Sequence, residues 1–216
     1  MDNKNKNDLK NYRPMKFVDQ MERNKHILLL YDDQKYAYWI VGRYFHNGFA
    51  KGESCIFYTS DRPEIIEKQL SAGGIDVSLF KQKNLLRIYG IERSDDNKHN
   101  IPHALDQIRE EYTKDMKPPY RRVGGTITDV QTIDGMRFNI LLEKAGHQHF
   151  DEFNYSQICY YDISKIEPTR KHEWISSLLR NHHCVIYASE PNKAVAFETA
   201  LLEEDDNGKN DNDNFE

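Results

Sequence analysis

The chain has 216 residues, with 30 basic and 35 acidic side chains and a formal net charge of −5. A hydrophobic content of 38% excludes a wholly disordered chain and is ample for one buried core. No apolar run approaches the roughly 18 residues that a membrane span needs. The mild charge argues against a dedicated nucleic-acid binder. We therefore expect one globular domain that contacts neither membrane nor nucleic acid directly.

The acidic charge is concentrated at the end of the chain. Residues 203–216 carry seven acidic groups and one lysine, a charge of −6 that leaves the other residues at +1. Such a polar run has little to bury, so it predicts a disordered acidic tail. Residues 1–20, whose start is rich in Asn and Lys, predict a flexible N-terminal segment. The folded domain is then expected over residues 21–202.

Three cysteines, Cys55, Cys159 and Cys184, each lie in an apolar run. Their odd number and apolar neighbours predict buried, reduced thiols and a cytoplasmic location. The first eleven residues also lack the apolar stretch of a secretory signal. There is no paired CxxC motif to suggest a structural zinc site.

Apolar runs of strand length alternate along the chain with segments of helical periodicity. The predicted strands span 27–31, 54–58, 85–89, 122–128, 157–161 and 184–187. The predicted helices span 36–50, 62–72, 101–116, 134–150, 173–180 and about 192–202, with a polar loop at 92–100. This alternation predicts an α/β fold with three layers, in which helices cover both faces of a mostly parallel sheet.

Acidic residues follow several predicted strands. Asp32 and Asp33 come directly after Tyr31, Asp61 follows the second strand, and Asp162 follows the fifth. Ligands of open α/β sheets bind beyond the carboxyl ends of the strands, so we expect these residues at a ligand site. Capping of the following helix is the competing interpretation for Asp33, and Asp61 is expected as the N-cap of the helix at 62–72.

The motifs of nucleotide hydrolysis and of nucleophilic catalysis are missing. Neither GxxxxGK[ST] nor GxGxxG after a strand occurs, and the turn after the first strand offers two carboxylates where a triphosphate needs backbone N–H groups. There is no GxSxG elbow. These absences argue against an ordinary ATPase or hydrolase.

The histidines do not form a local metal-binding motif. His147 and His149 lie two residues apart and His182 and His183 are adjacent, whereas ligands on one helix face lie four apart. We therefore predict neither a metal site nor a cofactor. His26 is interpreted as a strand-edge residue, and the basic pair at 121–122 as solvated.

Seven short segments together carry a family resemblance. They are HILLLYDD at 26–33, FHNGFAKGESCIFY at 45–58, GIDV at 74–77, RVGG at 122–125, LE at 142–143, CYYD at 159–162 and LRNHHCVI at 179–186. Their order and spacing, over about residues 24–190, resemble the MEDS family, the methanogen/methylotroph DcmR sensory domain. That family is similar to KaiC-like, RecA-like proteins that have lost the phosphate loop.

The resemblance implies a bacterial or archaeal sensory domain that responds to simple hydrocarbon derivatives. It also implies a histidine kinase or transcription regulator as partner, since no output domain is visible here. By position, the recurrent polar residues of the family correspond to Asp32, Asp33, Glu143, Cys159, Asp162 and His182. The family often has an acidic residue after the fourth strand, where this chain reads Gly125-Thr126-Ile127, which further weakens a hydrolase interpretation.

The leading hypothesis is a non-catalytic sensory domain that binds a small organic ligand and signals to a separate partner or to a second copy of itself. Its ligand site is expected to comprise Tyr31, Asp32, Asp33, Asp61, Glu143, Cys159, Asp162 and His182. One alternative is a diverged nucleotide hydrolase in which Asp32, Asp61 and either Asp129 or Asp162 hold a metal–nucleotide. The other is an interaction scaffold without a ligand.

Overall fold

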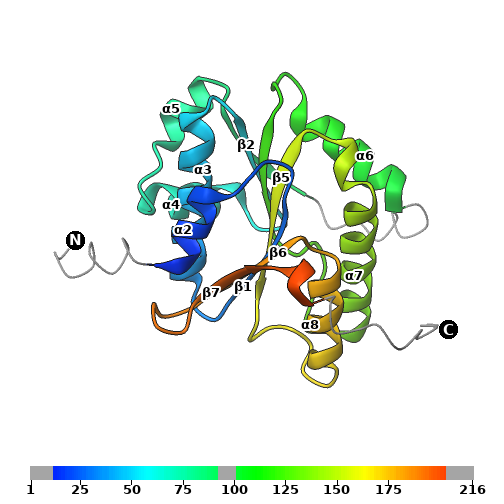
Figure 1. Ribbon diagram of the computed structural model, residues 1–216. Helices are drawn as coiled ribbons and strands as arrows, with labels where there is room; N and C mark the ends of the chain where they lie inside the picture. Colours follow the sequence, from blue (N-terminus) through cyan, green and yellow to red (C-terminus); the bar gives the residue numbers. More distant parts are fainter. Residues whose placement is uncertain (1–11, 92–100, 203–216) are drawn as a thin grey trace.

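A seven-stranded sheet forms the centre of the molecule (Figure 1). The computed structural model describes residues 12–91 and 101–202. The strand order is β3-β2-β4-β5-β1-β6-β7, and every neighbouring pair is parallel except β6 with β7. The strands are β1 (His26–Tyr31), β2 (Ser54–Thr59), β3 (Leu86–Gly90), β4 (Tyr120–Gly124), β5 (Tyr155–Asp162), β6 (Cys184–Ala188) and β7 (Val195–Glu198).

Helices cover both faces of this sheet, which confirms the predicted three-layer α/β fold. One face carries α2 (Arg13–Gln20), α3 (Gln34–Ala50), α4 (Pro63–Ala72) and α5 (Val77–Gln82). The other carries α6 (Ile101–Thr113), α7 (Ile133–Gln148) and α8 (Lys171–Arg180). Short 3₁₀ helices η2 (Phe150–Glu152) and η3 (Thr199–Leu202) complete the described elements. No helix among residues 12–91 and 101–202 is long and apolar enough to cross a bilayer.

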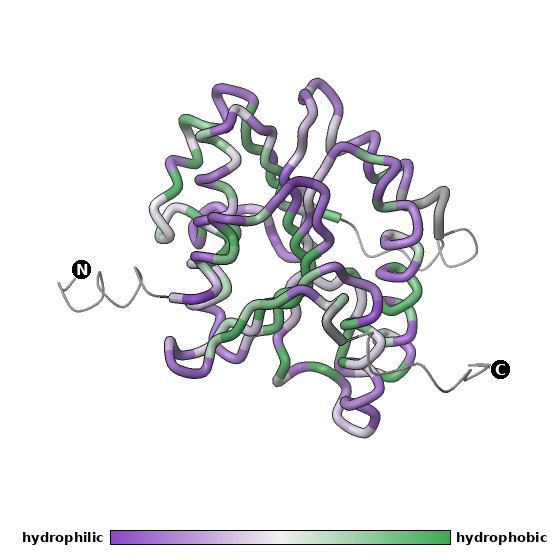
Figure 2. Tube along the Cα trace, in the orientation of Figure 1, coloured by the Kyte–Doolittle hydropathy of each residue, from purple (hydrophilic) through white to green (hydrophobic). Residues whose placement is uncertain are grey.

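The central strands are buried on both faces because both faces are covered. Every residue of β1 and β2 is buried. Ile27 and Leu29 join the core beneath α3, whereas Leu28 and Leu30 join the core that contains Trp174 of α8. Figure 2 shows the central strands mostly green and the connecting loops mostly purple, as expected for a parallel sheet between two helical layers.

The predicted last helix, at about 192–202, is wrong. Residues 195–198 instead form β7, an antiparallel strand at the edge of the sheet, and η3 follows it. Val195 pairs with Tyr187, and Glu198 with Cys184. The backbone groups along the outer edge of β6 would be unpaired without β7, and they supply its hydrogen-bond partners. Helical periodicity in the sequence does not reveal this pairing.

Part of the segment that the sequence predicts as flexible, residues 1–20, forms a helix. Residues 13–20 form α2, which packs against α3, and Tyr12 is only 1% exposed. The Tyr12 hydroxyl donates to the Ser189 carbonyl oxygen at 2.9 Å. Residues 1–11, the predicted loop at 92–100 and the predicted acidic tail at 203–216 lie outside the described residues.

Two smaller boundaries also differ from the prediction. The fourth strand ends at Gly124, so residues 125–128 leave the sheet early. Asp61 is not the N-cap of α4, because Arg62 occupies that position and makes no side-chain capping bond. The Asp61 N–H instead donates to Oγ1 of Thr59 at 2.9 Å.

Candidate functional site

A row of polar side chains crosses the sheet face that α6 and α7 cover. Arg122 of β4 is in register with Gln157 of β5, which is in register with His26 of β1. Cys159 lies two residues after Gln157 and therefore on the same face. All four residues are buried. Inward-facing positions of a parallel sheet are normally apolar, so this polar row is a candidate functional site.

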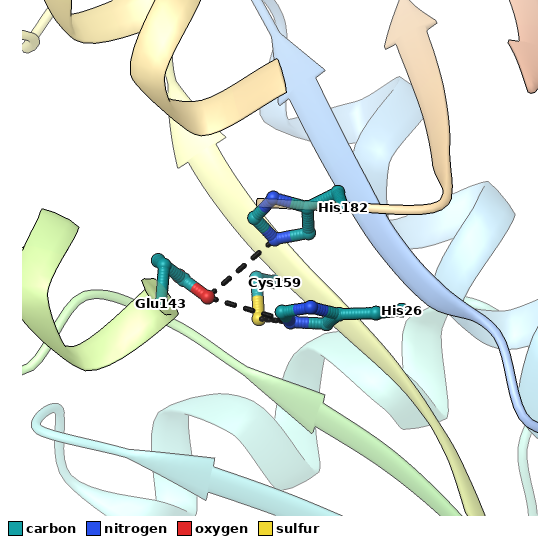
Figure 3. A group of neighbouring side chains, drawn as sticks. All are labelled: His26, Glu143, Cys159 and His182. Atoms are coloured by element: carbon teal, nitrogen blue, oxygen red, sulfur yellow. Dashed lines mark hydrogen bonds and ion pairs between the residues drawn. The ribbon is translucent and has the colours of Figure 1, made fainter. Parts of the chain in front are cut away.

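Four side chains converge at one end of that row (Figure 3). His26 Nε2 lies 3.3 Å from Cys159 Sγ and 3.4 Å from Glu143 Oε2. His182 Nε2 lies 3.5 Å from the same Glu143 oxygen. The four residues come from β1, α7, β5 and the turn before β6. One ligand atom from each lies within 4.8 Å of all the others, and we call them the His–Glu–Cys cluster.

His182 points its Nε2 atom at this cluster. Its Nδ1 lies 2.7 Å from the carbonyl oxygen of Leu178 in α8. A carbonyl oxygen can only accept, so Nδ1 carries a proton. Nε2 is buried and has no hydrogen-bond partner. The loop before β6 thus aims this second imidazole nitrogen at Glu143.

Glu143 is held as an anion. Burial alone would raise the pKa of its carboxyl group, but the imidazoles of His182 and His26 hold that pKa well below its usual range. The hydroxyl of Tyr161 donates to Oε1 at 2.6 Å, which leaves Oε2 facing the histidines. Burial, and then the charge of His182, lower the pKa of His26 to about 3, so this imidazole is neutral at physiological pH.

Arg122 lies at the other end of the row, among three tyrosine rings. Its guanidinium carbon is 5.5 Å from the ring centroid of Tyr58, 4.9 Å from that of Tyr112 and 4.4 Å from that of Tyr155. The residue is 8% exposed, yet its Nε and Nη1 have no hydrogen-bond partner. The Tyr112 hydroxyl also lacks one. A permanently charged group with unpaired donors is costly to bury.

A cavity of about 60 Å³ lies beside Arg122, between the sheet and the helices α6 and α7. Its polar lining includes His26, Arg109, Arg122, Asn139, Glu143 and Gln157, and its apolar lining includes Ile91, Ile108, Ile127 and Leu142. We call it the arginine cavity. Because His26 and Glu143 belong to both its wall and the His–Glu–Cys cluster, the two form one continuous site.

A second cavity, of about 250 Å³, lies at the carboxyl ends of the strands. Tyr31, Asp61 and Asp162 line it, together with Asp129 and Lys165. We call it the edge cavity. Three of the eight predicted site residues lie there, and ligand binding at this edge of the sheet stays a prediction.

The eight predicted residues do not form a single site. Glu143, Cys159 and His182 meet in the His–Glu–Cys cluster, away from the edge cavity. Asp32 accepts hydrogen bonds from the hydroxyls of Tyr187 and Ser189, at 2.8 and 2.9 Å. The side chain of Asp33 accepts from the backbone N–H of Lys35 and caps α3, as the competing interpretation proposed.

Sequence reasoning missed the residues that complete the buried site. His26 is 1% exposed rather than a strand-edge residue, and Arg121 and Arg122 are buried rather than solvated. A usable signal existed, because charged or amide side chains at alternate positions of apolar strands are rarely buried without a function. The prediction of no metal site considered only neighbours in sequence, whereas these ligand atoms come from four separate elements.

Comparisons with known proteins agree with this fold. A protein of Pyrococcus horikoshii, solved in a structural study, has a TM-score of 0.57 at 12% identity, covering 85% of this chain and 91% of that one. A KaiC-like protein from the same hyperthermophilic archaeon has a TM-score of 0.57 at 14% identity, covering 82% and 80%. No curated protein matches. Residues 25–183 match the methanogen/methylotroph DcmR sensory domain, and the chain belongs to this MEDS family.

Proposed function

We propose that this chain is a sensory domain that binds a small carboxylate in the arginine cavity. The observation that carries the proposal is the buried guanidinium of Arg122, which lines the cavity and whose Nε and Nη1 have no hydrogen-bond partners. Guanidinium groups form strong hydrogen bonds to carboxylates. A bound carboxylate would accept from this guanidinium and balance its buried charge.

The remaining lining supports a ligand of this class. Arg109 brings a second guanidinium to the cavity, and Ile108, Ile127 and Leu142 supply an apolar wall. A volume of about 60 Å³ limits the ligand to a few heavy atoms. A carboxylate with a short hydrocarbon end, such as acetate or propionate, combines the charge and the apolar surface that this lining recognises.

We further propose that the domain is non-catalytic. The connection from β1 to α3 is only Asp32 and Asp33, and both carboxylates are already hydrogen bonded. Such a turn offers no cradle of backbone N–H groups to the phosphates of a nucleotide. Membership of a sensory family supports the same conclusion.

Signal output is also part of the proposal. A ligand alters a partner's behaviour only if it binds two states of the domain unequally. The cavity lies between the sheet and the helices α6 and α7, so ligand binding there would change how these helices pack. We propose a histidine kinase, a transcription regulator or a second copy of the domain as the recipient, and a cytoplasmic location, which the three unpaired buried cysteines support.

A thermal-shift series tests the ligand. At a ligand concentration 100-fold above Kd, a carboxylate should add about 2.7 kcal/mol to the free energy of unfolding, a rise in Tm of about 5–10 °C. Formate, acetate, propionate and butyrate are compared with acetamide and ethanol at equal ionic strength. Stabilisation by the neutral compounds alone would contradict the proposal.

Two matched variants locate the ligand. Arg122→Met keeps an unbranched apolar stem and removes the charge, and it should abolish the stabilisation by carboxylate. Lys165→Met removes the cation that lines the edge cavity and should leave the stabilisation intact. The reverse pattern would place the ligand at the carboxyl ends of the strands, where the sequence analysis expected it, and would overturn our choice of cavity.

A further inference from the structure

The His–Glu–Cys cluster has the donor set of a transition-metal site. We propose that His26, Glu143, Cys159 and His182 bind one Zn²⁺ ion. This inference goes beyond the sensory function above, because it assigns a metal to residues that the carboxylate does not need. It also departs from the sequence analysis, which predicted no metal.

Three of the six separations between the ligand atoms fit a tetrahedral ion. Zinc–ligand bonds of about 2.0–2.3 Å place the ligand atoms of a tetrahedron about 3.3–3.6 Å apart. The separations from His26 Nε2 to Cys159 Sγ and to Glu143 Oε2 are 3.3 and 3.4 Å, and that from His182 Nε2 to Glu143 Oε2 is 3.5 Å. All four ligand atoms lie within 4.8 Å of one another, so the other three pairs would close to this range when an ion binds.

A cation would join groups of this cluster that come from separate elements. His182 Nε2 lies 3.5 Å from an oxygen of the Glu143 carboxylate and has no hydrogen-bond partner, so an ion between the two atoms would bind both. A divalent ion bound by one carboxylate and one thiolate is electrically neutral overall. That balance matters because the side chain of Glu143 is only 12% exposed and the other three residues are buried.

Surrounding groups orient the ligands as they do in established metal sites. Histidine ligands usually donate their second N–H to a backbone or side-chain acceptor. His182 donates from Nδ1 to the Leu178 carbonyl, and Nδ1 of His26 lies 3.4 Å from Nδ1 of His147. The Tyr161 hydroxyl occupies the other oxygen of Glu143, which leaves Oε2 for the ion. The amide of Gln157 donates to Cys159 Sγ at 2.8 Å.

The donor types select the metal. Magnesium and calcium ions prefer oxygen ligands, whereas imidazole and thiolate favour zinc and its neighbours in the first transition row. The arginine cavity gives the ion a route, since His26 and Glu143 lie in its wall. We therefore expect Zn²⁺, or Co²⁺ as a spectroscopic substitute, to bind at one ion per chain.

The test uses the full chain, freed of metal with a chelator under a reductant that contains no thiol. Titration with Co²⁺ alone, in a buffer free of carboxylates, should give the visible bands of a tetrahedral ion and a thiolate-to-metal charge-transfer band in the near ultraviolet. One equivalent of Zn²⁺ should displace these bands. The absence of carboxylate separates this result from the ligand proposal, so either can fail without the other.

Variants assign the ligands. Cys159→Ser should abolish the charge-transfer band, and His182→Gln should weaken Co²⁺ binding by at least about 10-fold, since even changes to outer residues cost that much. The matched control is Cys184→Ser, which alters a buried cysteine outside the cluster and should keep both the band and the affinity. Circular dichroism checks that each variant is folded.

Two results would overturn the proposal. The first is a wild-type chain that binds neither ion with a Kd below about 10 μM, equivalent to about −7 kcal/mol. It needs no variant, so a misfolded mutant cannot obscure it. The second is a charge-transfer band that persists in folded Cys159→Ser, which would mean that another cysteine supplies the thiolate.

Discussion

The ring of Tyr58 lies directly across Gly124 on the neighbouring strand. A Cβ atom added at Gly124 would fall 1.8 Å from the Cζ atom of that ring. Tyr58 has little room to retreat, because it stacks on Tyr112 at a centroid distance of 5.9 Å and its hydroxyl accepts from Gln157 at 2.8 Å. The absence of a side chain at Gly124 thus lets Tyr58 form one wall of the arginine cavity.

We expect Gly124→Ala to lower the free energy of unfolding by about 2 kcal/mol, the usual cost of overpacking a core. Urea denaturation measures the change. Gly146→Ala is the control, because a Cβ there meets nothing within 4 Å and alanine favours the helix α7. In a Tyr58→Ala background the cost of Gly124→Ala should nearly vanish. An unchanged cost would show that the ring is not what excludes the side chain.

A buried ion pair supports the opposite face of the sheet. Arg121 Nε donates to Glu53, and both residues are less than 5% exposed. Glu53→Ala should destabilise the protein by about 3–5 kcal/mol, because it leaves the Arg121 guanidinium buried without its carboxylate. The exposed pair of Arg43 and Asp19 is the comparison, and Asp19→Ala should cost no more than about 1 kcal/mol. Equal costs would contradict the argument from burial.

Glu167 makes the free energy of unfolding depend on pH in the acidic range. Its carboxylate accepts from the Thr169 hydroxyl at 2.6 Å and from the Trp174 indole at 2.9 Å, and these bonds lower its pKa to about 2. A lowered pKa stabilises the fold above the unfolded-state value of about 4.3, and this contribution is lost as the pH falls toward 2. The difference in unfolding free energy between wild type and Glu167→Gln should therefore shrink between pH 5 and pH 2. A constant difference would exclude the ionised group as its source.

The contribution of the N-terminal residue Tyr12 to the stability of the domain can also be tested. Tyr12→Ala should cost about 3–5 kcal/mol, because it empties a buried aromatic site beside α3. Tyr12→Phe removes the bond to the Ser189 carbonyl and keeps the ring, so about 1 kcal/mol is expected. Thermal unfolding of the two variants compares these costs. Wild-type stability in Tyr12→Ala would restore the predicted flexible segment at 1–20.

Local sequence patterns were sufficient to predict most of the strands and helices. Continuous apolar runs predicted β1, β2, β5 and β6 to within two residues at either end, because a strand buried on both faces needs such a run. They failed at β7, where pairing with β6 decides the conformation of residues that also have helical spacing. They also could not show that Tyr12 would find a partner in Ser189, 177 residues later.

The sequence by itself determined the α/β class, the family and three members of the buried cluster, Glu143, Cys159 and His182. Only the tertiary structure decided where these residues lie and what joins them. Strand register brings His26, Gln157 and Arg122 into one row, although about 130 residues separate the first two. A metal or ligand site depends on the distances between its side chains in space. The spacing of residues along the chain reports those distances only within a single helix or strand, so the sequence signal for a site built from several elements is weak.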